Sequence, residues 1–286
     1  MVSEPKVTVV VPAYNAEATV GDCIGSLLAV EYPKDKMEII FVDDGSTDAT
    51  RDIIGRYPSV KLMKQSHGGP AQARNLGWRS SAGEAVVFTD SDCIVPPEWI
   101  VGLVAELDYV DVVGGSLKPA GADTPAERFE QMRRDRLYGN RRRFVTALPS
   151  CNLAFKRSVL EEAGGFDEDY KYASAEDYDL CTRVGRRGHK ILYEPAISVL
   201  HKHVTKDADL MRKARTHGRE IMLLRRKSGS HLLHETAKLA VKVILLPFTA
   251  AVRYSLSLMA LGFRYELNGV LGQVEGIKRY FLGKKT

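Results

Sequence analysis

The first part of the chain alternates between short apolar runs and segments whose apolar residues recur at helical spacing. Val7–Val11, Glu38–Val42 and Ala85–Thr89 are rich in β-branched and aromatic residues, which is typical of strands buried on both faces of a parallel sheet. Glu17–Ala29 has helical spacing, and Val60–Lys64 is a shorter apolar run. Strands that alternate with helices predict an α/β domain with a mixed, mainly parallel sheet flanked by helices.

The middle of the chain is less regular, but it continues this alternation. Pro70–Ser80 has helical character, as does the segment that holds Ile53 and Ile54. The pattern further predicts a strand at Val110–Gly114, a charged helix over Thr124–Arg143, a strand at Asn152–Phe155, a helix at Arg157–Ala163, a helix at Glu176–Arg186 and a strand at Ile191–Leu200.

The character of the sequence changes after residue 205, so we expect a main domain over 1–205 and a helical appendage over 206–286. Asp209–Lys227 interleaves basic and apolar residues, as expected of a helix at an anionic membrane surface or of a packing helix with a solvated face. Val243–Phe263 is apolar, but Pro247 and Arg253 interrupt it. We expect an interfacial helical hairpin there, with a membrane span or a soluble packing helix as alternatives.

Composition narrows the class of protein only slightly. The chain has 286 residues, 44% of them hydrophobic and 27% charged, with a net charge of +5, which is ordinary for a folded protein. The four cysteines are scattered without the spacing of a zinc or redox motif, so we expect reduced, buried thiols. The N-terminus lacks the features of a signal peptide. We therefore expect the main domain to face the cytoplasm.

Carboxylates follow two of the predicted strands. Asp43 and Asp44 come at the end of the second strand, and Asp90 and Asp92 follow the strand Ala85–Thr89. Ligands of open α/β sheets bind beyond the carboxyl ends of the strands. Carboxylates gathered there repel one another unless a cation or hydrogen-bond donors compensate. Mg²⁺ and Mn²⁺ prefer oxygen ligands and share them with substrate phosphates, so the pattern indicates a metal or nucleotide site.

An ordered set of motifs resembles a known family. VVVPAYN, FVDDGSTD, GGPAQARNLG, FTDSD, CNLAFKRSVLEEAGGFDE and AEDYDLCTR occur in this order. Together they resemble the inverting nucleotide-sugar glycosyltransferases of family 2, over roughly residues 6–205. The resemblance implies the Rossmann-like GT-A fold, with a nucleotide-binding half over 1–92 and an acceptor-binding half over 93–205. Pro149-Ser150-Cys151-Asn152 departs from the family, whose members usually carry Gly before Asn.

The resemblance also implies which residues contact the donor nucleotide. Tyr14 would lie against the base, Asp44 would accept a hydrogen bond from a base N–H, and Arg74 would face the donor phosphates. A guanidinium can bind phosphate oxygens in a bidentate manner. The remaining members of this nucleotide-binding set are Pro12, Asn15 and Glu17 in the first loop, Asp43, which would shape its own loop with Ser46, and Asp90 and Ser91 after the fourth strand.

Metal and catalytic roles follow from the same resemblance. Asp92 is the favoured ligand of Mn²⁺ or Mg²⁺, with Asp90 supporting the ribose and the metal. A later histidine ligates the metal in some relatives, and we favour His201 over His203. Asp177 would be the base that takes the acceptor proton, as inverting transfer requires, and Glu176 would orient Asp177 or bind the acceptor.

These features together predict a metal-dependent, inverting glycosyltransferase. It would move a sugar from a nucleotide diphosphate donor, preferably a UDP-sugar, to a glycan or lipid-linked acceptor at the cytoplasmic face of a membrane. Glycan, polysaccharide or glycolipid assembly would each fit. The alternatives are a sugar-nucleotide nucleotidyltransferase and an inactive membrane scaffold with a transferase-like domain. The core lacks a basic motif with interleaved aromatic residues, so we expect no nucleic-acid partner.

Overall fold

The computed structural model describes residues 4–121, 124–202, 206–254 and 258–283, with side chains for all of these except 247–253. The chain divides into two compact units. The first consists of residues Met1–Ala120 and Arg134–Lys202, and the second of Gly121–Arg133 and His203–Thr286. His203, one of the two candidate metal-ligating histidines, lies outside the described residues.

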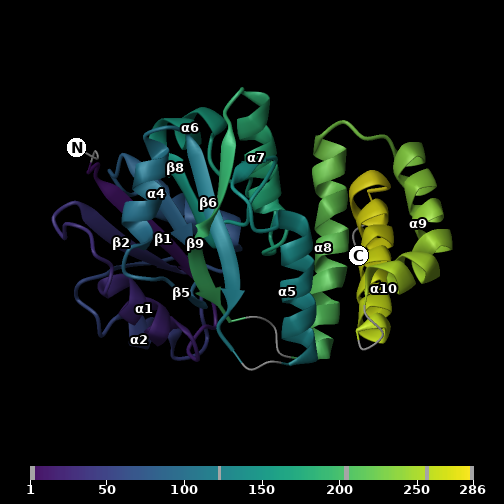
Figure 1. The fold of residues 1–286 in the computed structure, drawn as a ribbon, viewed down its shortest axis with the longest axis horizontal. Helices are drawn as coiled ribbons and strands as arrows, with labels where there is room; N and C mark the ends of the chain where they lie inside the picture. The colour runs from purple at the N-terminus through teal and green to yellow at the C-terminus, as the bar shows by residue number, and fades with distance from the viewer. Residues whose placement is uncertain (1–3, 122–123, 203–205, 255–257, 284–286) are drawn as a thin grey trace. The chain divides into compact units, whose positions relative to one another are not determined.

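One mixed sheet forms the centre of the first unit (Figure 1). Its strand order is β3-β2-β1-β4-β8-β6-β9-β5, and β7 pairs with β9. The first four strands are parallel, β8 is antiparallel to both β4 and β6, and β9 runs parallel to β6. The strands are β1 (Val7–Ala13), β2 (Met37–Asp43), β3 (Lys61–Lys64), β4 (Ala85–Thr89), β5 (Cys93–Ile94), β6 (Val112–Pro119), β7 (Arg143–Val145), β8 (Asn152–Lys156) and β9 (Ile191–His201).

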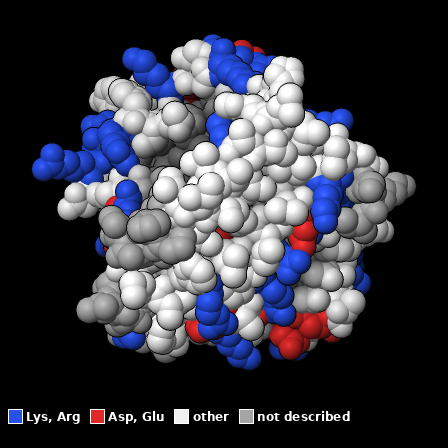
Figure 2. All heavy atoms as spheres, turned by 90° about the vertical axis from the view of Figure 1, so that its right-hand side faces the viewer, with Lys and Arg blue, Asp and Glu red and all other residues white. Residues whose placement is uncertain are grey.

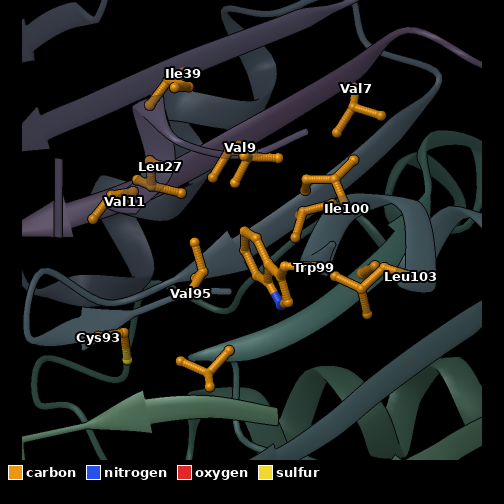
Figure 3. Close-up of a cluster of buried hydrophobic side chains, with 14 of the residues drawn as sticks. Val7, Val9, Val11, Leu27, Ile39, Cys93, Val95, Trp99, Ile100 and Leu103 are labelled. Atoms are coloured by element: carbon orange, nitrogen blue, oxygen red, sulfur yellow. The ribbon is translucent and has the colours of Figure 1, made fainter. Parts of the chain in front are cut away.

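Helices cover both faces of this sheet, which explains the continuous apolar runs of its strands. Val9 packs into a cluster with Trp99 and Ile100 (Figure 3), whereas the next residue, Val10, packs with Phe88 in a second cluster. Successive side chains of a strand point to opposite faces, so both faces of β1 must be apolar. The helices of this unit are α1 (Val20–Leu28), α2 (Thr50–Ile54), α3 (Pro70–Arg79), α4 (Trp99–Leu107), α6 (Arg157–Ala163) and α7 (Glu176–Arg186).

Most predicted elements are confirmed, and the differences have local causes. Helix α1 begins at Val20 and not at Glu17, because Glu17 contacts the next loop: its carboxylate accepts a hydrogen bond from the backbone N–H of Ala49 at 3.0 Å. The charged helix expected up to Arg143 ends at Tyr138, where Gly139 takes a φ of 68° that favours glycine. Short strands β5 and β7 and helix α4 were not predicted.

The second unit is helical in its described part. Its elements are most of α5 (Pro125–Tyr138), α8 (Asp207–Lys227), α9 (Leu232–Arg253), α10 (Met259–Gly276) and a π-helical turn at Ile277–Phe281. Helices α8 and α10 approach closely: a Cβ on Gly272 would collide with the backbone carbonyl of Arg215. The apolar residues of α8 are buried, among them Leu210 and Met222. The basic, amphipathic pattern of α8 is therefore that of a packing helix with a solvated face.

The apolar stretch Val243–Phe263 is shared between two helices. It begins in α9 and ends in α10, whereas residues 255–257 and the side chains of Pro247 and Arg253 lie outside the described part. Across the two helices, Lys242 forms an ion pair with Glu266 at 3.6 Å. Among the described residues, we find no helix with the length and apolar character needed to cross a membrane.

Candidate functional site

The first loop of the candidate site follows β1. Tyr14 is 45% exposed and stacks on His67, with 4.2 Å between the ring centroids. Asn15 adopts a φ of 47°, and its side-chain oxygen accepts a hydrogen bond from the backbone N–H of Thr47 at 2.8 Å. The backbone N–H of Asn15 donates to the Ser46 hydroxyl at 3.0 Å. This loop is thus joined to the one after β2, with Tyr14 at its surface and Pro12 half-buried at the end of β1.

Asp43 and Asp44 are both buried at the end of β2, and each carboxylate accepts hydrogen bonds from a neighbouring loop. Asp43 accepts a hydrogen bond from the Ser46 N–H at 3.1 Å and forms an ion pair with Arg51 at 2.7 Å. Asp44 accepts hydrogen bonds from three groups of the loop that leads into α3, namely the side chain of Gln65 and the backbone N–H groups of Gly68 and Gly69, at 2.6 to 3.0 Å. The expected hydrogen bond from a nucleotide base to Asp44 stays a prediction, and it would add to donors that already contact both carboxylate oxygens.

Arg74 lies buried on α3 between two carboxylates. It donates to Asp90 at 2.7 Å and to Glu176 at 2.9 Å, and its guanidinium lies 5.5 Å from the centroid of the Phe166 ring. Burial acts to lower the pKa of Arg74, but Asp90 and Glu176 outweigh it and raise that pKa above its ordinary value. The Nε atom of Arg74 has no hydrogen-bond partner among the described residues. The expected contact of Arg74 with donor phosphates stays a prediction.

Asp90, Asp92 and His201 converge where β4 and β9 end. One ligand atom from each lies within 4.8 Å of the others, and the Nε2 atom of His201 is 3.6 Å from a carboxylate oxygen of Asp92. Both carboxylates are partly exposed, whereas His201 is buried. Ser91, between the two acids, is half-buried. Two carboxylates and an imidazole form a donor set that suits Mn²⁺ or Mg²⁺, so these residues fit the metal that the resemblance implies.

Asp177 and Glu176 begin helix α7. Asp177 is 9% exposed, and it accepts a hydrogen bond from the Ser150 N–H at 3.2 Å. Burial and then the neighbouring Glu176 raise the pKa of Asp177 to about 8, while Arg74 acts in the opposite direction. Glu176 binds Arg74 and also accepts a hydrogen bond from the Ser174 N–H at 2.7 Å. Asp177 can therefore accept a proton near neutral pH, as a general base must.

The sequence did not indicate several residues that the fold brings to this region. His67 stacks on Tyr14 and lies 3.0 Å from Asp44. Cys93 and Cys151 both lie beside His201, and they are far apart in the sequence. The pairing of β5 with β9 places Cys93 opposite His201, and a two-residue strand is too short to be recognised from a sequence pattern.

Arg74 connects the two halves of the site. The candidate metal-ligating group contains Asp90, which binds Arg74, and Arg74 binds Glu176, which precedes Asp177. A group that could hold a cation is thus linked by a buried guanidinium to a carboxyl group with a raised pKa. Such an arrangement can stabilise a phosphorylated leaving group on one side and remove a proton on the other.

Most of the first unit matches the sequence model of one protein family. The family described as "Glycosyl transferase family 2" matches residues 8–164. The chain is 31% identical over 212 residues to a probable glycosyltransferase, YdaM, of Bacillus subtilis, with 67% of this chain and 49% of YdaM covered. It is 30% identical to the pre-mycofactocin glycosyltransferase of Mycobacterium tuberculosis, with 74% of this chain and 46% of that protein covered. The chain therefore spans about half the length of these relatives.

Solved structures share the architecture. The mannosyltransferase PcManGT of Pyrobaculum calidifontis, in complex with GDP-Man and Mn²⁺, superposes with a TM-score of 0.67 and 22% identity, covering 97% of this chain and 88% of that one. TarS of S. aureus, in complex with UDP-GlcNAc, superposes with a TM-score of 0.56 and 19% identity, covering 98% and 92%. At these identities the likeness establishes the fold alone.

Proposed function

The chain belongs to glycosyltransferase family 2 and has the GT-A fold, and we propose that it transfers a sugar from a nucleotide diphosphate donor to an acceptor with inversion at the anomeric carbon. The observation that carries this proposal is the linked group of Asp90, Arg74 and Glu176, which connects a set of metal-ligating side chains to Asp177. The alternative of an inactive scaffold would not require these buried charges to be kept together.

Asp177 is the proposed base. The acceptor hydroxyl oxygen attacks the anomeric carbon as the bond to the diphosphate breaks, and the hydroxyl proton passes to a carboxylate oxygen of Asp177. The Ser150 N–H donates to one oxygen of that carboxylate and the Tyr178 N–H to the other, so the carboxylate is held in a defined orientation. Glu176 binds Arg74, which supports the proposal that it positions Asp177 through its charge and through helix α7.

Asp92, Asp90 and His201 would hold Mn²⁺ or Mg²⁺, which as a Lewis acid neutralises charge on the leaving diphosphate. Asp90 shares one carboxylate oxygen with Arg74, so the guanidinium adds positive charge beside the same group. Solved structures of similar fold contain Mn²⁺, which supports the use of a divalent cation by this chain.

The donor proposed is a UDP-sugar, with GDP- and dTDP-sugars as the alternatives. Tyr14 and His67 offer a stacked pair of rings at the surface of the first loop, on which a nucleobase could stack. The two similar structures named above contain UDP-GlcNAc in one case and GDP-Man in the other, so the fold accommodates either base. Discrimination between bases would then depend on the hydrogen bonds that Asp44 and its loop make available.

An acceptor at an anionic membrane surface is proposed from helix α9. Leu233, Val241 and Ile244 are exposed and recur at helical spacing along this helix. Figure 2 shows a face of the molecule on which broad uncharged areas adjoin Lys and Arg side chains. Exposed apolar side chains beside basic ones suit the headgroup region of anionic lipids. We propose on this basis that the protein acts on a lipid-linked or membrane-bound glycan at the cytoplasmic face.

The decisive experiment measures nucleotide release from defined donors. Purified protein with Mn²⁺ is incubated with UDP-glucose, UDP-GlcNAc or GDP-mannose, and released nucleoside diphosphate is measured. We expect release from one donor class, which Asp177→Asn reduces by about 10²- to 10⁴-fold, the usual contribution of a general base. Asp179→Asn is the matched control, because Asp179 lies on the same helix and pairs with Arg183 at 2.7 Å. Near-normal turnover by Asp177→Asn would refute the base assignment.

A thermal-shift panel identifies the nucleotide independently of catalysis. UDP, GDP, dTDP and CDP are compared with and without Mn²⁺, because a ligand that binds only the folded protein raises its apparent stability. We expect the largest shift with UDP and Mn²⁺ together. Absence of a shift with any nucleotide, under conditions in which the protein is folded, would contradict the transferase proposal as a whole.

A further inference from the structure

Cys93, Cys151 and His201 form a second cluster of metal-ligating atoms. The two sulfur atoms and one imidazole nitrogen lie within 4.8 Å of one another, and all three residues are buried. Cys93 is on β5, Cys151 precedes β8 and His201 ends β9. Cys93 and His201 are directly opposite in the antiparallel pairing of β5 with β9, so their side chains share one face of the sheet. Three separate segments therefore converge on one point.

Asp92 adds a fourth ligand atom to this cluster. One of its carboxylate oxygens lies 3.8 Å from the sulfur of Cys93 and 3.6 Å from the Nε2 atom of His201. Two sulfur ligands at about 2.3 Å from a tetrahedral zinc ion lie about 3.8 Å apart, and the other pairs of ligands in such a site are closer. The two distances that Asp92 makes, to Cys93 and to His201, are therefore close to those between ligands of a tetrahedral site, and the ligand atoms of Cys93, Cys151 and His201 lie within 4.8 Å of one another.

From this geometry we propose that Cys93, Cys151, His201 and Asp92 form a binding site for a thiophilic divalent cation such as Zn²⁺. The chemistry of the ligands selects the ion, because thiolates favour Zn²⁺ whereas carboxylates alone suit Mg²⁺ and Mn²⁺. As the cation binds, each thiol releases its proton to solvent and each sulfur forms one bond to the metal. The buried position of both sulfurs excludes water, which would otherwise compete for the cation.

This site would exclude Mn²⁺ from the proposed catalytic group. His201 belongs to both groups of ligands, and Asp92 of the proposed catalytic group also lies 3.8 Å from the sulfur of Cys93, so a cation held by the two sulfurs would occupy the same imidazole and carboxylate. Zn²⁺ binds nitrogen and sulfur ligands more tightly than Mn²⁺ does. Bound Zn²⁺ would therefore inhibit the enzyme, because His201 and Asp92 would no longer be available to ligate Mn²⁺. This inhibitory consequence rests on the proposed function, whereas the binding of the cation itself does not.

Cadmium tests the binding site directly, because a thiolate–cadmium bond gives an ultraviolet charge-transfer band. Reduced, metal-free protein is titrated with Cd²⁺, and bound cadmium is quantified after desalting. We expect a band that saturates at one ion per chain, and a loss of affinity of at least about tenfold in Cys93→Ala and in Cys151→Ala, since even outer-shell changes cost about 10- to 100-fold. Cys181→Ala is the matched control, because Cys181 is buried outside the cluster and its thiol donates to the Leu148 carbonyl.

If the wild-type protein gives no thiolate band, or if Cys93→Ala and Cys151→Ala bind Cd²⁺ as tightly as Cys181→Ala does, the site does not exist. Thermal unfolding of each variant shows that it is folded, and the agreement of two separate cysteine variants guards against an effect of misfolding in one of them.

Competition tests the inhibitory consequence separately. The Mn²⁺-dependent thermal shift with nucleotide is measured while Zn²⁺ is added. We expect Zn²⁺ to abolish the shift in the wild-type protein and excess Mn²⁺ to restore it, whereas Cys93→Ala should require at least about tenfold more Zn²⁺. Equal sensitivity of Cys93→Ala and Cys181→Ala would overturn the shared-ligand inference. If no nucleotide produces a shift, the proposed function fails, but the cadmium titration still decides the thiolate site.

Discussion

Arg74 and Glu176 form a buried ion pair in which the two side chains, on helices α3 and α7, approach to 2.9 Å. Each residue is only 2% exposed, and 102 positions of sequence separate them. A buried charge is costly unless it is paired and hydrogen-bonded. The pair therefore constrains α3 and α7 to one relative arrangement, and that arrangement holds Asp177 beside the carboxyl ends of the strands.

Removal of Arg74 should destabilise the protein strongly. Arg74→Ala leaves Glu176 buried without its cation, and breaking one partner of a buried pair costs about 3–5 kcal/mol. Arg79→Ala is the control on the same helix, because Arg79 forms an exposed pair with Glu168 at 3.2 Å, and such pairs contribute about 0–1 kcal/mol. Urea denaturation measures both. Equal free energies of unfolding for the two variants would mean that the buried pair contributes little.

Turnover should increase with pH and level off above a midpoint near the pKa of Asp177. Burial and Glu176 raise that pKa to about 8. The base acts in its deprotonated form, so the rate should fall about tenfold for each pH unit below that midpoint. Glu176→Gln removes the neighbouring negative charge and should move the midpoint to lower pH. A pH–rate profile of nucleotide release measures both effects. An unchanged midpoint in Glu176→Gln would show that the charge of Glu176 does not raise the pKa of Asp177.

The same pKa shift has a consequence for stability. Because the pKa of Asp177 is raised in the folded protein, the folded form binds the proton more tightly than the unfolded chain does. The stabilisation from this group is complete below the ordinary aspartate pKa and is lost as the pH rises to about 8. Asp177→Asn, which cannot ionise, should lack this component in a comparison of unfolding free energies at pH 5 and pH 8.

Donor binding should require the metal-ligating group. Asp92→Ala and His201→Ala should each remove most of the Mn²⁺-dependent thermal shift with nucleotide, and chelation of the metal in the wild-type protein should have the same effect. His189→Ala is a matched control, since His189 lies 2.8 Å from Asp111 and 3.0 Å from Glu162, away from this group. A full shift in His201→Ala would remove that histidine from the ligand set.

Stacking on Tyr14 should contribute to donor affinity and not to the chemical step. Tyr14→Ala should raise the KM for the donor by about 10- to 100-fold, since stacking of a base on an aromatic ring is worth about 1–3 kcal/mol, and should leave kcat close to its original value. Tyr109→Ala is the control, because Tyr109 is 83% exposed in the turn that follows α4. A change confined to kcat would indicate a role other than base binding.

Membrane binding should depend on the exposed apolar side chains of α9. The double variant Leu233→Asn and Ile244→Asn should bind less to vesicles of phosphatidylglycerol and phosphatidylcholine, because each substitution removes apolar surface that the lipid would bury. Phe144→Asn, at an exposed aromatic residue of β7, is the control. Sedimentation with vesicles measures the bound fraction, and equal binding of the two variants would exclude α9 as the contact surface.

The sequence by itself determined the class of fold and the positions of the acidic residues at the ends of strands. The apolar runs of β1, β2 and β4 indicated a sheet covered on both faces, because such strands need apolar residues on both sides. Asp90 and Asp177 are site candidates from the sequence because they lie in local motifs that resemble the family, and their roles stay predictions. Long-range contacts left no such local signal, and the ion pair of Arg74 with Glu176 was not predicted for that reason.

Only the tertiary structure decided which of these residues meet. Arg74 lies between Asp90 and Glu176, because α3 and α7 pack against the same face of the sheet, whereas its expected contact with donor phosphates stays a prediction. Cys93 and Cys151 looked like unrelated buried thiols, and the pairing of β5 with β9 places Cys93 beside His201. Local patterns reflect the periodicity of one element, whereas contacts between distant elements depend on strand order and register, which no short segment encodes.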